Sequence, residues 1–223
     1  MNRAKIKKGI KISIEKNIPI GGGLGGGSSN AAATLLKLNE LWGLAYSPGE
    51  LGEMGASLGS DVPFFCYRAS SAWVSGKGEM VQAVQLPADY WILLVFPFFS
   101  IDTVDAYRLW DLSRDLDKNG LTKEGNHNKI SSFESLKDGI SRGAAPHFFK
   151  KLENDFESVL FDKYPVFKEI QKLLNQEKAK KVLLSGSGSS VFAVFSTEKK
   201  AREGGENLVK AFSPIGIRVV RSI

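Results

Sequence analysis

Hydrophobic and polar residues alternate near the start of the chain, and the pattern then changes to a helical spacing. Isoleucines alternate with polar residues from Ile10 to Ile14, which predicts a strand over 11–15. Apolar side chains recur every three or four residues over 31–42, which predicts a helix. The stretch between these two patterns contains six glycines within seven residues, from Gly21 to Gly27. We therefore expect a strand, a glycine-rich loop and a helix, in that order.

The ends of the first two predicted helices carry capping signals. Ser28 or Ser29 is a suitable N-cap for the first helix, and Gly43 is a suitable residue for its end. Residues 47–50 read Ser-Pro-Gly-Glu, which is a capping box with proline at the first helical position. This box predicts a second helix over 51–58.

The rest of the chain predicts two domains of an α+β protein. From Pro87 onward the expected order is β-α-α-α-β-β-α-β, which is typical of a sandwich of antiparallel strands and helices. We therefore predict domains over 1–86 and 87–223, with a polar surface insertion at 111–145. The expected later elements are strands at 72–75, 79–84, 91–96, 182–184, 191–195 and 217–221, and helices capped by Thr103 and over 155–161, 165–176 and 197–212.

Composition narrows the possible partners. The formal net charge of +6 mildly favours anionic ligands, but lysine and arginine are dispersed, so we expect no nucleic-acid partner. The sequence shows no signal peptide and no apolar run long enough to cross a membrane, so we expect a cytoplasmic protein without a membrane partner. The lone Cys66 excludes an internal disulfide and is expected to be a core residue. No cluster of cysteine and histidine has metal-ligand spacing, and the oligomeric state does not follow from the sequence.

Six of the seven residues from Gly21 to Gly27 are glycine, and we call this segment the first glycine loop. Glycine is costly to order, so such density suggests that backbone N–H groups must approach an anion closely. The start of the following helix also favours a phosphate. The alternative is a flexible linker without a binding role, but a flexible linker does not require a helix to begin directly after it. No lysine follows the last glycine as in a Walker loop, and a loose Gly-x-Gly-x-x-Gly match is a weak signal.

The stretch from Pro19 to Ala33 resembles the phosphate-binding motif of the GHMP kinases, a family that includes galactokinase, homoserine kinase and mevalonate kinase. Within the family it is most similar to the kinases of the non-mevalonate isoprenoid pathway. The resemblance implies a two-domain fold, with an N-terminal part like ribosomal protein S5 domain 2 and a ferredoxin-like C-terminal sandwich. It implies ATP and Mg²⁺ as cofactors, with Ser28 or Ser29 reaching the metal. The implied ATP-binding residues are Gly21, Gly22, Gly23, Leu24, Gly25, Gly26, Gly27, Ser28, Ser29 and Asn30.

Asp61 lies between a Gly-Ser turn and an apolar segment. On the residues alone, an aspartate that binds neighbouring backbone N–H groups in a turn is the more common case. The family carries a Leu-Gly-Ala-Asp-Val-Pro-type segment at this distance after the glycine loop, and its aspartate is catalytic. The resemblance therefore implies that Asp61 is the catalytic residue, with Ser60 in place of the usual alanine.

Three further segments match the family. Tyr107 falls on an aromatic position that stacks near a cytosine ring, although core packing beside Trp110 is an equal alternative. Asn154 opens an Asn-Asp-Phe-Glu segment, in which we expect it to cap a helix. A second glycine turn over 185–190 fits a plain hairpin but also resembles the last family motif, which shapes the substrate pocket. That resemblance implies substrate contacts by Gly186, Ser187 and Gly188.

The implied reaction is ATP-dependent phosphorylation of the 2-hydroxyl of 4-diphosphocytidyl-2-C-methyl-D-erythritol, a cytidine diphosphate-linked polyol. The alternatives are another small-molecule kinase of the family, of homoserine or mevalonate type, and a non-catalytic nucleotide-binding remnant. The remnant is considered because the family carries a further N-terminal segment with a Pro-Ala-Lys-x-Asn strand. Ala4-Lys5-Ile6 is too close to Ile14 to be that strand. Without its lysine we expect a loss of at least roughly 10²-fold in rate and a destabilised first domain.

Overall fold

The computed structural model describes residues 9–86, 90–118, 136, 140 and 149–222. The chain divides into two compact units, each of which is described by itself. The first unit is formed by Met1–Ile20 with Gly25–Gln85, and the second by Gly21–Leu24 with Leu86–Ile223. The domain limits at 1–86 and 87–223 stay a prediction. Most of the predicted insertion at 111–145 lies outside the described residues, and residues 111–118 belong to a helix.

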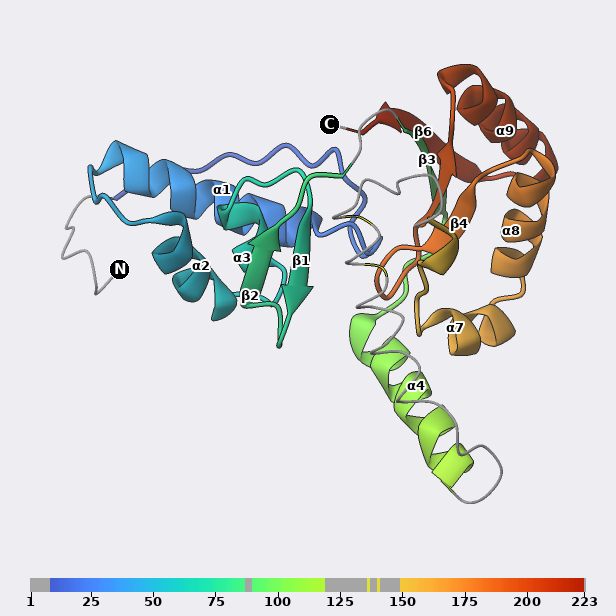
Figure 1. Cartoon of the computed structure of the whole chain (residues 1–223), viewed down its shortest axis with the longest axis horizontal. Coiled ribbons are helices and arrows are strands. Elements are labelled where there is room, and N and C mark those ends of the chain that lie inside the picture. Colours follow the sequence, from blue (N-terminus) through green and yellow to red (C-terminus); the bar gives the residue numbers. More distant parts are fainter. Residues whose placement is uncertain (1–8, 87–89, 119–135, 137–139, 141–148, 223) are drawn as a thin grey trace. The chain divides into compact units, whose positions relative to one another are not determined.

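The described residues of the first unit form three helices and a two-stranded antiparallel sheet (Figure 1). Its small core is built from four buried side chains, including that of Cys66, as the sequence predicts. The capping box at Ser47 is confirmed, because its side chain accepts from Glu50 N–H while the Glu50 carboxylate accepts from Ser47 N–H. The elements are α1 (Gly26–Leu41), α2 (Pro48–Ala56), α3 (Val62–Cys66), β1 (Ala72–Ser75) and β2 (Met80–Ala83).

The strand predicted over 11–15 is wrong for the described chain. The segment forms no strand, and the side chains of Ile10, Ile12 and Ile14 are 39%, 52% and 55% exposed. A strand forms only where a neighbouring strand accepts and donates its backbone hydrogen bonds. In the part of the chain that the structure describes, no strand pairs with this segment. The alternation of isoleucines therefore indicates a strand face that is suited to burial, but this face is exposed in the described structure.

The start of α1 also differs from the prediction. The helix begins at Gly26, and its N-cap is Gly25 in the left-handed region, with φ +63° and no side-chain cap. Ser28 and Ser29 therefore lie inside the first turn, where the Ser29 hydroxyl donates to the Gly26 carbonyl at 3.1 Å. A side chain at Gly25 would meet the ring of Phe65 at 3.0 Å, so the structure favours glycine over serine at this cap. The predicted end at Gly43 is confirmed by its φ of +60°.

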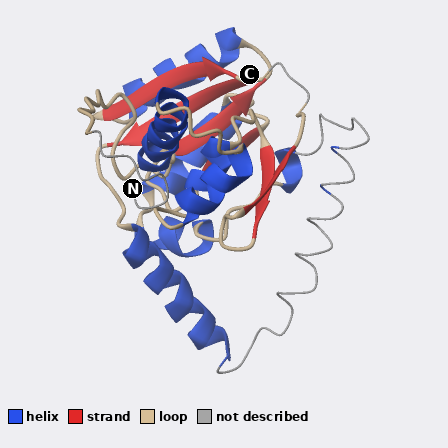
Figure 2. Ribbon diagram, turned by 90° about the vertical axis from the view of Figure 1, so that its left-hand side faces the viewer, coloured by secondary structure: helices blue, strands red, loops and turns tan. Residues whose placement is uncertain are grey.

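The second unit contains a four-stranded antiparallel sheet in the order β4-β5-β3-β6. Figure 2 shows these red strands running side by side. The observed order of elements after residue 90 agrees with the predicted order and with the α+β class. The elements are β3 (Trp91–Pro97), α4 (Thr103–Lys118), a 3₁₀ turn (Phe149–Lys151), α7 (Glu157–Lys163), α8 (Val166–Gln176), β4 (Lys181–Leu184), β5 (Val191–Phe195), α9 (Glu198–Ala211) and β6 (Ile215–Arg221).

Two helices cover the sheet of the second unit. Helix α9 packs on β3, β5 and β6, and α8 packs on β4 and α9 (Figure 1). The core between these layers contains Leu93 and Phe195 from the sheet and Phe167 and Leu174 from α8, all fully buried. Burying such side chains is the main source of stability of a unit of this size. The sheet therefore provides a rigid base for the loops at the ends of its strands.

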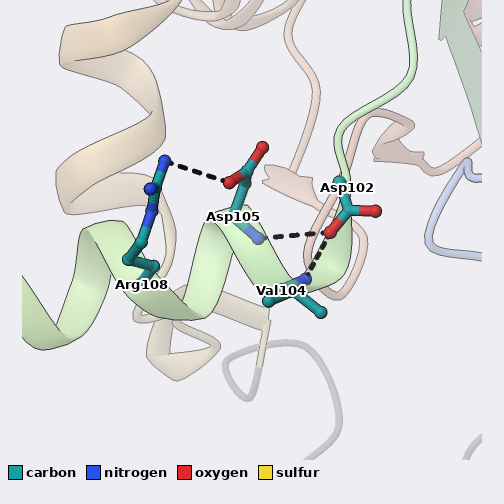
Figure 3. A network of polar contacts seen from close by, with 4 residues as sticks. All are labelled: Asp102, Val104, Asp105 and Arg108. Carbon is teal, nitrogen blue, oxygen red and sulfur yellow. Dashed lines mark hydrogen bonds and ion pairs between the residues drawn. The ribbon is translucent and has the colours of Figure 1, made fainter.

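The N-cap of α4 is Asp102 rather than the predicted Thr103. The Asp102 carboxylate accepts from Val104 N–H at 2.8 Å and from Asp105 N–H at 3.3 Å (Figure 3). One turn further along the helix, Arg108 forms an ion pair with Asp105 at 3.1 Å (Figure 3). Aspartate is a stronger cap than threonine because its charge also complements the helix dipole. This leaves the Thr103 hydroxyl free for another partner.

Candidate functional site

The first half of the first glycine loop is held by the second unit. Gly21 and Gly23 both adopt φ +70°, and Gly22 between them is buried. A Cβ atom on Gly23 would overlap the Ser185 carbonyl oxygen and lie 2.9 Å from the Gly188 carbonyl oxygen. No other residue fits at Gly23 without moving the backbone of its neighbours. The glycine at this position thus permits a close approach of two backbone segments.

The second half of the loop leads directly into α1 in the first unit. No side chain caps this helix, and no acidic residue lies in its first turn. The N–H group of Ser29 binds the Gly25 carbonyl, and the N–H groups that precede it in the helix have no acceptor within the helix. A helix start with uncapped N–H groups and a positive dipole end suits an anion such as phosphate.

Lys16 places a positive charge beside this helix start. A Cβ atom on Gly26 would lie 3.6 Å from the Lys16 Nζ atom, so the ammonium group lies next to the first residue of α1. The Lys16 side chain is exposed. Reasoning from the sequence looked for a lysine after the glycines and missed one that precedes them. The signal was its position five residues before Gly21, at the approach to the loop.

Asp61 occupies the N-cap position of α3 but makes no capping hydrogen bond. Its side chain is exposed, and among the described residues it has no hydrogen bond or ion pair. The interpretation of Asp61 as an aspartate that binds neighbouring N–H groups is therefore wrong. The backbone of Gly78 packs directly against the turn that carries Asp61. The contact is so close that a side chain at Gly78 would overlap the Ser60 carbonyl oxygen. The carboxylate is held in place by backbone packing, and its oxygens remain available.

The second glycine turn (Ser185–Ser190) joins β4 and β5, so the predicted hairpin is confirmed. Within it, Ser185 N–H donates to Ser190 O at 2.8 Å, and Gly188 N–H donates to Ser185 O at 2.9 Å. Gly186 and Gly188 adopt positive φ angles of +54° and +84°, which favour glycine. Ser187 shares a hydrogen bond of 3.0 Å with Thr103 at the start of α4.

This turn holds the first glycine loop by its carbonyl groups. Ser190 N–H donates to the Gly22 carbonyl at 3.2 Å, and the Ser185 hydroxyl donates to the Gly23 carbonyl at 2.8 Å. Since the carbonyls of Gly22 and Gly23 are bound to the turn, the loop is anchored by its acceptors. Its donors are then the groups left to meet an anionic ligand.

Tyr107 lies on α4, one helical turn beyond Thr103. Its side chain is 54% exposed, and its ring meets the ring of Phe156 edge to face at a centroid distance of 4.9 Å. Core packing therefore does not describe Tyr107, because half of the side chain faces solvent. The edge-to-face contact orients the ring while leaving its other surface accessible. Trp110 contacts Arg114 instead, at 4.6 Å from its ring centre.

Asn154 does not cap a helix as predicted. Helix α7 begins at Glu157, and its N-cap is Phe156, with no side-chain cap. The Asn154 side-chain oxygen accepts from Phe156 N–H at 3.0 Å, and its nitrogen donates to the carbonyls of Leu184 at 2.9 Å and Gly186 at 2.8 Å. The amide oxygen therefore binds an N–H group one residue before the helix, while the amide nitrogen holds the two carbonyls at the end of β4.

Glu157 binds the same strand end as Asn154. Its carboxylate accepts from Leu184 N–H at 2.7 Å. Burial raises the pKa of the Glu157 carboxyl, and the Leu184 hydrogen bond and the charge of Lys181 partly oppose that rise. Sequence reasoning assigned no role to this residue. The signal was the Asn-Asp-Phe-Glu segment, in which both polar ends bind one backbone position.

Metal and membrane signals are absent from the described parts of the chain. Among these residues, no three His, Cys, Asp or Glu side chains are grouped so that they could hold a metal ion. None of the described helices has both the length and the apolar character to span a membrane.

Comparison with known proteins gives consistent matches in both halves of the chain. Residues 1–69 match the family description "GHMP kinases N terminal domain", and residues 130–214 match "GHMP kinases C terminal". The chain is 41% identical over 223 residues to 4-diphosphocytidyl-2-C-methyl-D-erythritol kinase of Thermodesulfovibrio yellowstonii, covering all of this chain and 73% of the relative. It is 43% identical over 195 residues to the protein of that name in Syntrophus aciditrophicus, covering 87% of this chain and 64% of the relative.

Solved structures agree in fold. A crystal structure of 4-(cytidine 5'-diphospho)-2C-methyl-D-erythritol kinase superposes with a TM-score of 0.67 at 29% identity, over 92% of this chain and 68% of that one. Homoserine kinase from Cytophaga hutchinsonii superposes with a TM-score of 0.66 at 19% identity, over 93% and 68% of the two chains. The second likeness shows the fold alone. The chain thus spans about two thirds to three quarters of the length of these relatives.

Proposed function

Because this chain belongs to the GHMP kinase family, we propose that it acts as an ATP-dependent 4-diphosphocytidyl-2-C-methyl-D-erythritol kinase in isoprenoid precursor biosynthesis. The phosphoryl group would pass from ATP to the 2-hydroxyl of this polyol. The uncapped start of α1 behind a loop of left-handed glycines is the observation that carries the proposal. Relatives with more than 40% identity bear that name, which specifies the substrate.

The residues from Gly21 to Asn30 bind the ATP phosphates in this proposal. The carbonyls of Gly22 and Gly23 are bound by the second glycine turn, which turns them away from any ligand. The free N–H groups at the start of α1 and the ammonium group of Lys16 then supply positive charge to the phosphates. Positioning and charge neutralisation supply most of the rate in phosphoryl transfer.

Mg²⁺ is expected to accompany ATP, and the hydroxyl groups in the first turn of α1 suit it. Mg²⁺ prefers oxygen ligands and binds substrate phosphates with few protein groups. The Ser29 hydroxyl donates its proton to the Gly26 carbonyl, so its oxygen lone pairs remain available, and Ser28 lies beside it. When bound, the ion would neutralise charge on the phosphate oxygens. We assign this role to Ser28 or Ser29.

Asp61 is the catalytic residue of the proposal. Its carboxylate has no partner among the described residues, so it can accept a hydrogen bond from the substrate hydroxyl. As the hydroxyl oxygen bonds to the γ-phosphorus, the bond from that phosphorus to the bridging oxygen of ADP breaks. The hydroxyl proton passes to Asp61.

The second unit provides the groups that we assign to the polyol substrate. Gly186 is exposed, Ser187 is half-buried and Gly188 is buried in the second glycine turn, and Thr103 joins that turn to the start of α4. Tyr107 presents an accessible ring surface one turn along the same helix, which suits stacking against a cytosine base. We propose a dissolved small molecule in the cytoplasm as substrate, with no nucleic-acid or membrane partner.

The first test is an assay of ADP release with 4-diphosphocytidyl-2-C-methyl-D-erythritol, homoserine and mevalonate as separate substrates. We expect turnover with the cytidine-linked polyol and none with the other two alcohols. The variant Asp61→Asn should lower kcat by about 10²- to 10⁴-fold, because it removes the proton acceptor. Turnover by Asp61→Asn equal to that of the parent would remove Asp61 from this role.

A matched control is Asp162→Asn. Asp162 forms an ion pair with Lys168 at 2.6 Å, and both side chains are exposed to solvent. Exposed ion pairs contribute about 0–1 kcal/mol to stability. This variant loses the same charge at an exposed position that has no role in the proposal, so its kcat should equal that of the parent.

A further inference from the structure

Asn154 and Glu157 together take up the outer edge of β4 at the second glycine turn. In the sheet order β4-β5-β3-β6, β4 has β5 on one side and no strand from the described residues on the other. At Leu184, the last residue of β4, the N–H group is bound by Glu157 and the carbonyl by Asn154. Two side chains thus occupy the backbone groups that a neighbouring strand would otherwise bind.

The hydrogen bonding of Asn154 is complete and reaches into the turn itself. Its amide nitrogen donates to Leu184 and to Gly186, two residues further on, and its oxygen accepts from Phe156 N–H. Asn154 is half-buried, and a side chain without an amide at this position would leave both carbonyls without this donor. The amide therefore fixes the direction in which the chain leaves β4.

The turn transmits this position to the first glycine loop. Ser185 lies between the two carbonyls that Asn154 holds, and its hydroxyl donates to the Gly23 carbonyl. Ser190 closes the turn by accepting from Ser185 N–H, and its own N–H donates to the Gly22 carbonyl. The hydrogen bonds of Asn154, the backbone of residues 184–186 and the hydrogen bonds of Ser185 therefore connect Asn154 to the loop, and all of these residues belong to the second unit.

We propose that Asn154 is a positioning residue for the phosphate-binding loop, acting through Ser185 on the carbonyl of Gly23. The proposal rests on the function proposed above, because it assigns the nucleotide phosphates to that loop. The hydrogen bonds of the Asn154 amide go to backbone groups, so we assign it no contact with substrate. Asn154 acts on the reaction by holding the Gly22 and Gly23 carbonyls of the first glycine loop against the second glycine turn. The N–H groups of that loop then keep a fixed orientation toward the phosphates.

A double-mutant cycle between Asn154→Asp and Ser185→Ala tests this connection. Aspartate keeps the acceptor for Phe156 N–H but turns a carboxylate oxygen toward the carbonyls of Leu184 and Gly186. Each single variant should raise the KM for ATP and the Kd for ADP roughly tenfold. The double variant should bind nucleotide no more weakly than the weaker-binding single variant, since the two substitutions break the same series of contacts. Multiplying effects, or unchanged nucleotide binding, would overturn the proposal.

Asn39→Asp provides the control for a purely structural effect. Asn39 holds the loop after α1 by a matching pair of bonds, since its amide donates to Tyr46 O at 2.9 Å and accepts from Tyr46 N–H at 3.0 Å. This variant should lose stability like Asn154→Asp but keep the parent's nucleotide affinity. Equal loss of affinity in both variants would show that instability alone is responsible. If Asn154→Asp does not fold, Asn154→Ala replaces it, because alanine removes the donors without adding charge.

Amide hydrogen exchange of the ligand-free protein separates this proposal from the proposed function. Exchange of the Ser190 N–H, which donates to Gly22, should be faster in Asn154→Asp than in Asn39→Asp. An unchanged rate would overturn the positioning role. A parent protein that neither binds ADP nor releases it from ATP would refute the proposed function, and the exchange rates would still decide the role of Asn154.

Discussion

At the scale of single residues, the site depends on positions where backbone must approach backbone, and Gly78 supports Asp61 in this way. Gly78 has φ +114°, and a Cβ atom there would overlap the Ser60 carbonyl oxygen and lie 2.7 Å from the Ser60 carbonyl carbon. Gly78→Ala should therefore displace the Ser60–Asp61 turn. We expect a loss of about 1–3 kcal/mol in the free energy of unfolding and a fall in kcat of about 10²-fold. Urea denaturation and steady-state kinetics measure the two effects.

Gly59→Ala is the control for Gly78→Ala, because it adds a methyl group on the other side of the same turn. A Cβ atom on Gly59 would lie 3.6 Å from Val62 Cγ2 and 3.8 Å from Ser28 Oγ, which are ordinary contacts. This variant should keep the kcat of the parent. If Gly78→Ala also keeps it, the position of Asp61 does not depend on packing against the β1–β2 turn.

At the scale of elements, the edge of β4 makes stability depend on pH through Glu157. The folded chain raises the pKa of this carboxyl by burial, so the folded state holds its proton at pH values where the unfolded state has lost it. Its contribution to the free energy of unfolding therefore falls as pH rises above the ordinary glutamate value, up to the folded pKa. Glu157→Gln keeps an acceptor for Leu184 N–H without this titration. Relative to the parent, the variant should gain stability between pH 4 and pH 7.

Urea denaturation of both proteins at pH 4, 5, 6 and 7 measures this difference. Glu198→Gln is a suitable control, because Glu198 forms an exposed ion pair with Arg202 on α9. A difference between Glu157→Gln and the parent that stays constant over this range, or that shrinks toward neutral pH, contradicts the assignment.

At the scale of the whole molecule, the net charge of +6 should assist binding of two anionic substrates. Long-range attraction raises the rate of encounter and is screened by salt, with a Debye length of about 10 Å at 0.1 M ionic strength. The kcat/KM for ATP and for the polyol should therefore fall as KCl rises from about 50 to 300 mM, while kcat changes less. Sucrose at matched viscosity is the control. A kcat/KM that does not respond to salt would exclude electrostatic steering.

The sequence predicted the element order of the second unit well, since local signals determine most of it. The hairpin at the second glycine turn, the capping box at Ser47 and the end of α1 at Gly43 depend on neighbouring residues alone. The prediction of a strand at 11–15 was wrong because alternating residues only make strand pairing possible. A strand also needs a neighbouring strand, and no described strand pairs with this segment. The predicted cap of α4 was wrong by one residue, because Asp102 binds the first N–H groups of the helix. The predicted cap of α1 was wrong by three or four residues, because the helix begins after Gly25, where the ring of Phe65 leaves no room for a side chain.

The candidate site was predicted less completely than the fold. The first glycine loop and Asp61 carry recognisable patterns of residue types, although their roles stay predictions. Asn154 was expected to bind its own helix, because capping is the ordinary use of asparagine at such a position. Two of its three partners, the carbonyls of Leu184 and Gly186, lie 30 and 32 residues further along the chain. Contacts of that kind depend on the sheet bringing β4 to Asn154, and no local pattern reports them.

The crowding around Gly23 also has a genetic consequence. All four glycine codons share their first two bases, so every single-base missense change at this position introduces a residue with a Cβ atom. Each such atom would overlap the Ser185 carbonyl oxygen, and none of these residues adopts φ +70° readily. Codon 23 should therefore tolerate only synonymous changes, unless a second mutation first shifts the turn at Ser185. A change of amino acid at position 23 should therefore be found only together with a second mutation.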